Sequence, residues 1–351
     1  MYIVINSRFL TQNITGVQRF AIEISKQLKK QLGDNVQLVS PKNIIHNDLA
    51  KELDVKVIGN KTGHLWEQLD LPKYLKSIDS PLVLNLANTA PLFYNNKMTV
   101  VHSLSFSFKK WNSLKFYYFY KFLIPLVLKT SKHVFTVSDY TLNEIVKYYP
   151  NIKNLQTRMS VVYNGHFYSN VKIKNDGSNY ILYVGTVSKS KNIKILVDAL
   201  KLINKRKIII NLKIVGGANS QVFENEKIDN FEWIEFIGHI NDTSELASLY
   251  SNAKLFVFPS LYESFGIPPV EAQSFGCPVL SSNTTSLPEI CGDGAIYFNP
   301  YDINDLKEKI ELVLNDENLK NELKTKGFEN IKRFSWEQSA KKIIEVIERL
   351  K

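Results

Sequence analysis

The stretch LFVFPSLYESFGIPPVEAQSFGCPVLSSN, residues 255–283, decides the fold class of this chain. It opens on an apolar run typical of a strand buried on both faces. A loop follows up to Gly266, and Pro268 and Pro269 suit the first turn of a helix, where no amide hydrogen is needed. A strand, a loop and a helix in this order predict a parallel sheet, and such sheets bind ligands at the carboxyl ends of their strands. The loop is therefore the first candidate for a binding site.

Two glutamates flank this junction, Glu263 in the loop and Glu271 one turn into the helix. An ionised carboxylate accepts hydroxyl hydrogens strongly, so the pair suits a polyol such as ribose or a hexose. The amides of Phe265, Gly266 and Ile267 can donate to an anion or to sugar oxygens. The alternative is that Glu263 is a solvated loop charge and that Glu271 only compensates the helix dipole.

Outward from this stretch, apolar β-type runs alternate with amphipathic helical stretches, which predicts parallel α/β sheets. Seven runs start at residues 2, 36, 55, 82, 98, 133 and 159, and six more start at 180, 208, 234, 254, 278 and 295. The polar stretch 167–179 contains Asn-Asp-Gly-Ser and predicts a linker. We therefore expect two domains, residues 1–168 and 169–335. A terminal helix over 336–351, begun at Ser335, has one apolar face and is expected to pack back on the first domain.

Composition limits the classes of partner. A chain of 351 residues with 44% hydrophobic residues can build two packed cores, and a net charge of +10 favours phosphorylated substrates or an anionic membrane. The sequence carries no zinc-finger or RNA-recognition pattern, so we expect no nucleic acid partner. Two cysteines cannot form a disulfide framework, and the opening residues MYIVINSRFL predict a strand and not a signal peptide. A cytoplasmic location with reduced thiols is expected.

Other junctions after predicted strands supply further candidates. In YVGTVSKSKN the loop favours a diphosphate, although its lysines can equally be surface residues. VGG and GHI can bring backbone close to a base. The candidates in the second half of the chain are Gly185, Thr186, Lys189, Lys191, Gly216 and Ile240.

The first half has three candidates of its own. Gly16 stands where a loop enters a helix after the first strand, a place suited to close approach of backbone to a phosphate. Arg19 follows on the first helical turn, where it can help to neutralise a diphosphate or lie on the helix surface. His102 comes just after a strand and is either a ligand contact or a structural histidine satisfied by backbone.

The runs ESFGIPPVEAQSFGCPV, YVGTVSKSKNIKILVDAL and VVYNGHF resemble the retaining glycosyltransferases of family 4, and the resemblance covers essentially the whole chain. It implies the GT-B fold, an α/β architecture of two Rossmann-like domains that face each other across a cleft. The first domain would take the acceptor and the second the nucleotide-sugar donor. By this resemblance Glu271 binds the ribose hydroxyls, and Glu263 with the loop Ser264–Phe265–Gly266 holds the transferred sugar.

Three positions depart from the family pattern. Thr186 stands where a basic residue is common, Ser190 replaces the Arg of an Arg-Lys pair, and Ser103 replaces the Asp that usually follows the histidine at 102. Either Lys189 supplies the missing charge or the diphosphate is held more weakly. The resemblance also implies that His102 lines the donor cleft, where it would hydrogen-bond the sugar or assist the leaving phosphate.

The activity implied is transfer of a hexose from a nucleotide sugar to a saccharide, with retention at the anomeric carbon. The matches LWEQLDLP and TGVQRF favour mannose from GDP-mannose, and a lipid-linked acceptor in bacterial surface polysaccharide synthesis is expected. The candidate catalytic residues are His102, Glu263 and Lys191. Because the chain has no D-x-D motif, we expect neither a metal nor any cofactor apart from the donor itself.

Two other functions stay open, a sugar phosphorylase of the same fold and a non-catalytic scaffold that binds nucleotide sugars. A dinucleotide oxidoreductase is disfavoured because no G-x-G-x-x-G opens either domain. Residues 109–132 mix lysines with aromatic residues and are too short and too charged to span a bilayer. This segment either lies on an anionic membrane surface or forms a partly buried helix.

Overall fold

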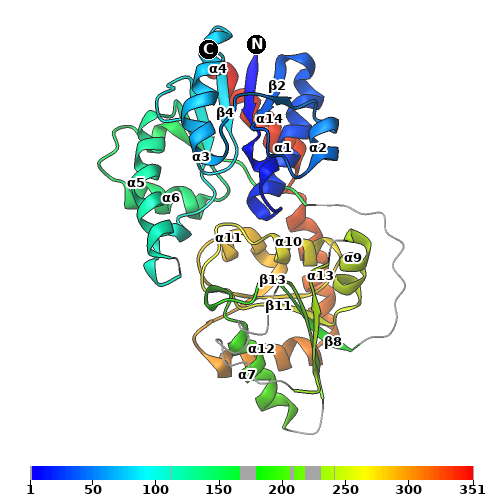
Figure 1. Cartoon of the computed structure of the whole chain (residues 1–351). Coiled ribbons are helices and arrows are strands. Elements are labelled where there is room, and N and C mark those ends of the chain that lie inside the picture. Colours follow the sequence, from blue (N-terminus) through cyan, green and yellow to red (C-terminus); the bar gives the residue numbers. More distant parts are fainter. Residues whose placement is uncertain are drawn as a thin grey trace. The chain divides into compact units, whose positions relative to one another are not determined.

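The computed structural model of the chain describes residues 2–111, 113–166, 179–205, 209–217, 231–240 and 242–350. The chain forms two compact units, drawn in Figure 1. Unit 1 comprises Met1–Gly165 and Phe334–Lys351, and unit 2 comprises His166–Arg333. The predicted linker, residues 167–179, lies outside the described residues except for Asn179.

Unit 1 is built on a parallel sheet of seven strands in the order β3-β2-β1-β4-β5-β6-β7. Every predicted run of the first half overlaps one of these strands, because strands buried on both faces are apolar throughout. The order reverses between β1 and β4, and in open α/β sheets that reversal is where ligands bind. The strands are β1 (Ile3–Asn6), β2 (Val36–Ser40), β3 (Lys56–Val57), β4 (Leu82–Asn85), β5 (Lys97–Val100), β6 (His133–Thr136) and β7 (Met159–Val161).

Helices cover both faces of this sheet, and the last of them comes from the other end of the chain. Ser335 caps α14 by accepting from the Gln338 amide, and α14 lies beside α1 (Figure 1). The Trp336 ring packs edge-on against Phe20 of α1 at 5.9 Å. The helices are α1 (Gly16–Leu32), α2 (Asn47–Glu52), α3 (Gly63–Leu65), α4 (Leu71–Ser77), α5 (Leu114–Thr130), α6 (Asp139–Tyr148) and α14 (Trp336–Arg349), and a π-helical turn, Trp66–Asp70, joins α3 to α4.

Unit 2 repeats the design with a parallel sheet of six strands in the order β10-β9-β8-β11-β12-β13, which reverses between β8 and β11. All six predicted runs of the second half overlap its strands. The strands are β8 (Tyr180–Val184), β9 (Asn211–Val215), β10 (Ile234–Gly238), β11 (Leu255–Phe258), β12 (Val279–Ser282) and β13 (Ala295–Phe298). The helices are α7 (Ile193–Asn204), α9 (Thr243–Asn252), α10 (Ile267–Ser274), α11 (Leu287–Cys291), α12 (Ile303–Asn315) and α13 (Glu317–Ile331).

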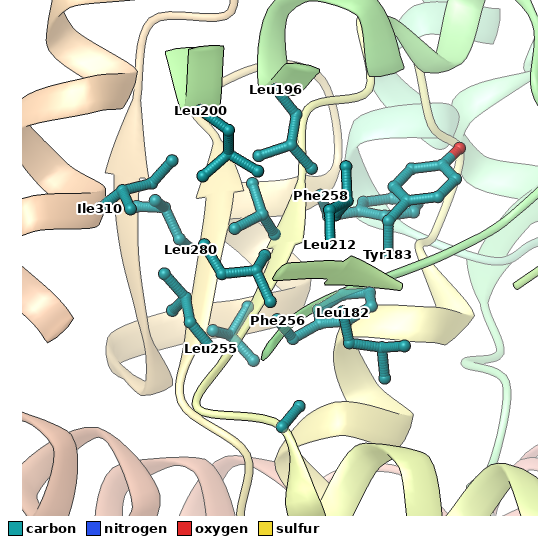
Figure 2. Packing of buried hydrophobic residues seen from close by; sticks show 14 of the residues in the cluster. Leu182, Tyr183, Leu196, Leu200, Leu212, Leu255, Phe256, Phe258, Leu280 and Ile310 are labelled. Atoms are coloured by element: carbon teal, nitrogen blue, oxygen red, sulfur yellow. The ribbon is translucent and has the colours of Figure 1, made fainter. Parts of the chain in front are cut away.

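Part of the core of unit 2 lies between this sheet and helices α7 and α12, and α9, α10, α11 and α13 also contribute buried residues to it. Figure 2 shows Leu196 and Leu200 of α7 and Ile310 of α12 meeting the strand residues Leu212 and Leu280. All five of these side chains are fully buried. The two parallel sheets thus confirm the α/β architecture predicted from the alternating runs.

Helix α5 carries large apolar side chains that are exposed among the residues the structure describes. Leu123, Ile124 and Val127 are buried against unit 1, whereas Tyr118 and Phe122, one turn apart, are 58% and 71% exposed. Of the helices in the described ranges, none combines the length and hydropathy that a bilayer crossing requires.

Candidate active site

The loop between β11 and α10 is held in place by hydrogen bonds from two neighbouring loops. The Leu261 amide donates to the Ser190 carbonyl at 2.8 Å, and Thr285 accepts from the Glu263 amide at 3.0 Å. The Ser286 hydroxyl donates to the carbonyls of Glu263 and Phe265 at 3.0 and 3.1 Å. The loop therefore has one fixed course at the point where the strand order reverses between β8 and β11.

An ion pair between Lys191 and Glu263 joins the loops that follow β8 and β11. The Lys191 Nζ lies 2.5 Å from Glu263 Oε1, and the Ser260 hydroxyl donates to the same oxygen at 2.7 Å. The Glu263 side chain is only 13% exposed, which rules out the alternative that it is a solvated loop charge. Lysine has three hydrogens to donate, so Lys191 can hold Glu263 and still offer a positive charge to a phosphate. Lys189 and Thr186 are exposed beside it.

Glu271 is positioned by its helix and by a tyrosine. It lies on the second turn of α10, and its Oε2 accepts from the Tyr250 hydroxyl of α9 at 3.0 Å. Tyr250 is fully buried, so its hydroxyl is a fixed donor that orients the carboxylate. Gly266, the residue before α10, has φ at +102°, and a Cβ there would meet Leu287 Cδ2 at 2.7 Å. The turn that carries the two glutamates therefore requires glycine at this position.

A row of glycines follows the carboxyl ends of β8, β9 and β10. The Gly185 amide donates to the Val215 carbonyl, and the Gly216 amide donates to the Gly238 carbonyl, both at 2.8 Å. A Cβ on Gly216, whose φ is +142°, would lie 2.1 Å from the Gly185 oxygen. The two backbones thus touch where side chains would normally stand, and a contact of these glycines or of Ile240 with a base stays a prediction.

The candidates of the first half lie in unit 1. Gly16 is exposed at the first position of α1, as predicted, and the Arg19 amide donates to the Thr15 carbonyl at 2.9 Å. Burial raises the pKa of Glu23, and the charges of Lys26 and Arg19 oppose that rise, so the guanidinium stands near Glu23 one turn further on.

His102 is enclosed by unit 1 and bonded to its backbone. Its side chain lies against the Phe20 ring at 4.9 Å, its amide donates to the Asn88 side chain at 2.7 Å, and its Nε2 lies 2.8 Å from the Leu86 carbonyl. A carbonyl only accepts, so Nε2 carries the hydrogen. Burial lowers the pKa of His102 to about 4, and the residue is neutral at pH 7. These bonds match the structural alternative, and a contact with the donor stays a prediction.

The buried state of His102 predicts how the free energy of unfolding varies with pH. The unfolded histidine takes a proton near pH 6.5, whereas the folded one stays neutral down to about 4. The unfolded state therefore binds more protons in this window, and stability is complete above pH 6.5 and falls by roughly 3 kcal/mol as pH drops to 4. Urea unfolding should show that His102→Gln loses this part of the slope. If the free energy of unfolding varies equally with pH in both proteins, the His102 imidazole is not shielded in the native state. The pKa of His133 is also lowered, but His133 is present in both proteins, so its contribution cancels in the comparison.

Unit 1 also contains a largely buried polar cluster, of which only Glu67 lies in a family motif quoted from the sequence, LWEQLDLP. It lies where the strand order reverses between β1 and β4, and we call it the switch-point cluster. Its members are Asn6, Arg8, His64, Glu67, Asn85 and Thr89.

Glu67 is the centre of the switch-point cluster and is 1% exposed. Its Oε1 accepts from Asn6 at 2.9 Å, from Thr89 at 3.0 Å and from Arg8 Nε at 3.4 Å. Burial alone would raise the pKa of Glu67, but the Arg8 charge, together with His64 and Asn6, lowers it to about 2. The carboxylate is therefore ionised. Trp66 of the LWEQLDLP motif is a core residue whose indole donates to the Ile58 carbonyl at 2.8 Å.

Comparison with known proteins finds that the chain is similar to glycosyltransferases. The family model described as glycosyl transferases group 1 matches residues 166–330. An uncharacterized glycosyltransferase of Methanocaldococcus jannaschii is 32% identical over 264 residues, which cover 73% of this chain and 70% of that protein. O-antigen chain mannosyltransferase B of Escherichia coli is 32% identical over 224 residues, or 60% of this chain.

These relatives differ in length from the chain. The chain spans 58% of the E. coli mannosyltransferase B and less than a third of the E. coli serotype-specific mannosyltransferases that it matches at 31% identity. Among solved structures, HepE of Anabaena in complex with UDP and glucose has a TM-score of 0.72 at 18% identity and covers 99% of both chains. The likeness extends over both units, and the predicted GT-B fold class is confirmed.

Proposed function

This chain belongs to the glycosyl transferases group 1 family, and from that premise we propose that it transfers mannose from GDP-mannose to a saccharide, with retention at the anomeric carbon. The acceptor that we propose is lipid-linked, in the synthesis of a bacterial surface polysaccharide. The family model matches unit 2, the likeness in fold covers both units, and E. coli relatives at 31–32% identity are named as mannosyltransferases. These names support the choice of sugar.

The observation that carries the proposal is the pairing of Lys191 with Glu263 at the switch point of unit 2. A carboxylate for the sugar hydroxyls and a cation for the diphosphate are there fixed 2.5 Å apart. As the bond between the anomeric carbon and the phosphate breaks, negative charge grows on the leaving diphosphate. Lys191 and the amino end of α10 are the groups of unit 2 that we assign to stabilise it. Because these groups already supply positive potential, we propose that no metal is required.

The donor is tested by a thermal-shift screen with GDP-mannose, UDP-glucose and dTDP-glucose. A ligand that binds only the folded protein raises its apparent stability by mass action. GDP-mannose should give the largest shift, and it should support slow hydrolysis of the donor in the absence of acceptor. UDP-glucose is the most informative alternative donor to compare with GDP-mannose, because HepE is found with UDP and glucose. A larger thermal shift with UDP-glucose would change the assigned donor to UDP-glucose. A thermal shift without hydrolysis or transfer would favour the alternative that the chain is a non-catalytic scaffold that binds nucleotide sugars.

We also propose that α5 rests on the inner, anionic face of the membrane that holds a lipid-linked acceptor. Residues 80–138 contain neither Asp nor Glu and, apart from the buried Lys97, six lysines. Tyr118 and Phe122 project from α5 into solvent, and basic residues beside exposed aromatic rings are favoured at such an interface. Flotation with phosphatidylglycerol vesicles should capture the protein at low salt, and Phe122→Ser should reduce the captured fraction. Equal capture by phosphatidylcholine vesicles, which carry no net charge, would show that attraction to anionic lipid does not drive the binding.

A further inference from the structure

The switch-point cluster of unit 1 occupies the same topological position as the Lys191–Glu263 pair of unit 2. Asn6 and Asn85 are the last residues of β1 and β4, the two strands between which the order reverses. Arg8 and Thr89 follow in the loops after these strands. A crevice of this kind is where parallel α/β sheets bind ligands.

Stability does not account for the polar groups gathered there. A buried ion pair is often no more stabilising than apolar residues of similar volume, because the loss of hydration offsets the attraction. The Arg8 and Glu67 side chains are 9% and 1% exposed, and Thr89 is bonded to both. The arrangement holds Glu67 ionised and in one orientation, with its second oxygen, Oε2, directed to His64.

His64 is the member of the cluster that meets solvent. Its Nδ1 lies 3.4 Å from Glu67 Oε2, and its side chain is 38% exposed. An ionised carboxylate only accepts hydrogen bonds, so Nδ1 carries the hydrogen, and in the neutral imidazole Nε2 is then the nitrogen that accepts. A histidine held in this way by a buried carboxylate has a fixed tautomer, and it presents one acceptor to a ligand.

An aromatic ring lies next to that acceptor. The Phe119 ring of α5 is 4.8 Å from the His64 ring and 40% exposed. A ring face offers an apolar platform, while Nε2 takes a hydrogen bond from a hydroxyl. A sugar suits both the ring and the Nε2 atom, because one pyranose carries hydroxyl hydrogens around its edge and C–H groups on its faces.

We propose that His64 and Phe119 bind the saccharide acceptor, with Nε2 of His64 accepting a hydrogen bond from an acceptor hydroxyl. Glu67 and Arg8 are positioning residues, since they act through His64. This inference rests on the proposed transferase function and adds to it the place on unit 1 where the acceptor sugar is held.

The test uses the full-length protein, the donor selected by thermal shift, and a panel of octyl glycosides of mannose, glucose, galactose and N-acetylglucosamine as acceptors. His64→Ala and Phe119→Ala should each raise the KM for the best octyl glycoside about tenfold, the effect of one lost contact of roughly 1.4 kcal/mol. Donor hydrolysis without acceptor should stay unchanged. Leu69→Ala is the matched control, because Leu69 is 52% exposed on the neighbouring turn and belongs to neither group.

Glu67→Gln separates positioning from folding. Glutamine keeps the shape and an acceptor for Asn6 and Thr89 but holds the His64 tautomer less firmly, so the KM for the octyl glycoside should rise while the KM for the donor stays constant. An unchanged acceptor KM in both His64→Ala and Phe119→Ala overturns the inference. So does a wild-type enzyme that hydrolyses donor but transfers to none of the glycosides. A wild-type protein that neither hydrolyses nor transfers from any donor refutes the proposed function itself, and the inference falls with it.

Discussion

Glu271→Ala is expected to abolish the thermal shift that the donor produces and to weaken donor binding on the order of 100-fold. We assign the carboxylate to the two ribose hydroxyls, and hydrogen bonds to a charged acceptor are each worth about 1.5–3 kcal/mol. Glu271 is well placed for this role because the buried Tyr250 hydroxyl fixes it at 3.0 Å. Isothermal titration calorimetry with the donor measures this loss of donor affinity directly.

Two companion variants separate binding from folding. Glu271→Gln keeps an acceptor for the Tyr250 hydroxyl but loses the charge, and it should retain a small part of the affinity. Tyr250→Phe leaves the carboxylate and removes only its fixed donor, so it should cost far less donor affinity than Glu271→Ala. If all three proteins fold as the wild type does and bind the donor equally well, Glu271 does not contact the ribose.

Arg8→Met is expected to lower the free energy of unfolding by about 4 kcal/mol at pH 7, since it leaves the buried Glu67 carboxylate without its cation. Arg8 is 7% exposed and reaches both Glu67 and Thr89, so water cannot readily replace it. The folded carboxyl, whose pKa is held at about 2 with Arg8 present, would lose the largest of the interactions that lower it. Urea denaturation at pH 7 measures the change.

The double variant Arg8→Met, Glu67→Gln is the control. Without the buried charge there is no ion left to compensate, and most of the lost stability should return, so the two substitutions should be strongly non-additive. Additive losses would show that Arg8 stabilises unit 1 through its aliphatic stem and not through Glu67. Because the pKa of Glu67 is lowered, its contribution in the wild type is complete above pH 4.5 and is lost as pH falls toward 2.

Local chemistry made much of the fold predictable. The runs that became β8 and β11 are apolar throughout because both faces of each strand are covered, and Pro268 and Pro269 mark the first turn of α10 because that turn needs no amide hydrogens. The loop with Glu263 and the helix with Glu271 were predicted for the same reason. Run lengths were less accurate: the run predicted over 98–103 extends beyond β5, which ends at Val100, although the buried Val101 still donates its amide hydrogen to the Phe135 carbonyl of β6 at 2.8 Å.

What could not be predicted depends on which strands are neighbours. Lys191 and Glu263 are 72 residues apart, and Arg8 and Glu67 are 59 apart. Only the sheet order places β8 next to β11, and β1 next to β4. A signal for the switch-point cluster was present, because Asn6 and Asn85 each end an apolar strand with a polar residue. Without the strand order, however, nothing in the sequence connects the two positions.

The division of the chain has a consequence for biosynthesis. Unit 2 is one continuous segment, His166–Arg333, whereas unit 1 is completed only by Phe334–Lys351. On the ribosome, α1 must therefore wait until residues 334–351 have been synthesised before α14 can cover it. During that interval Phe20 lacks the Trp336 ring, and the nascent chain carries an uncovered apolar surface for a chaperone to shield.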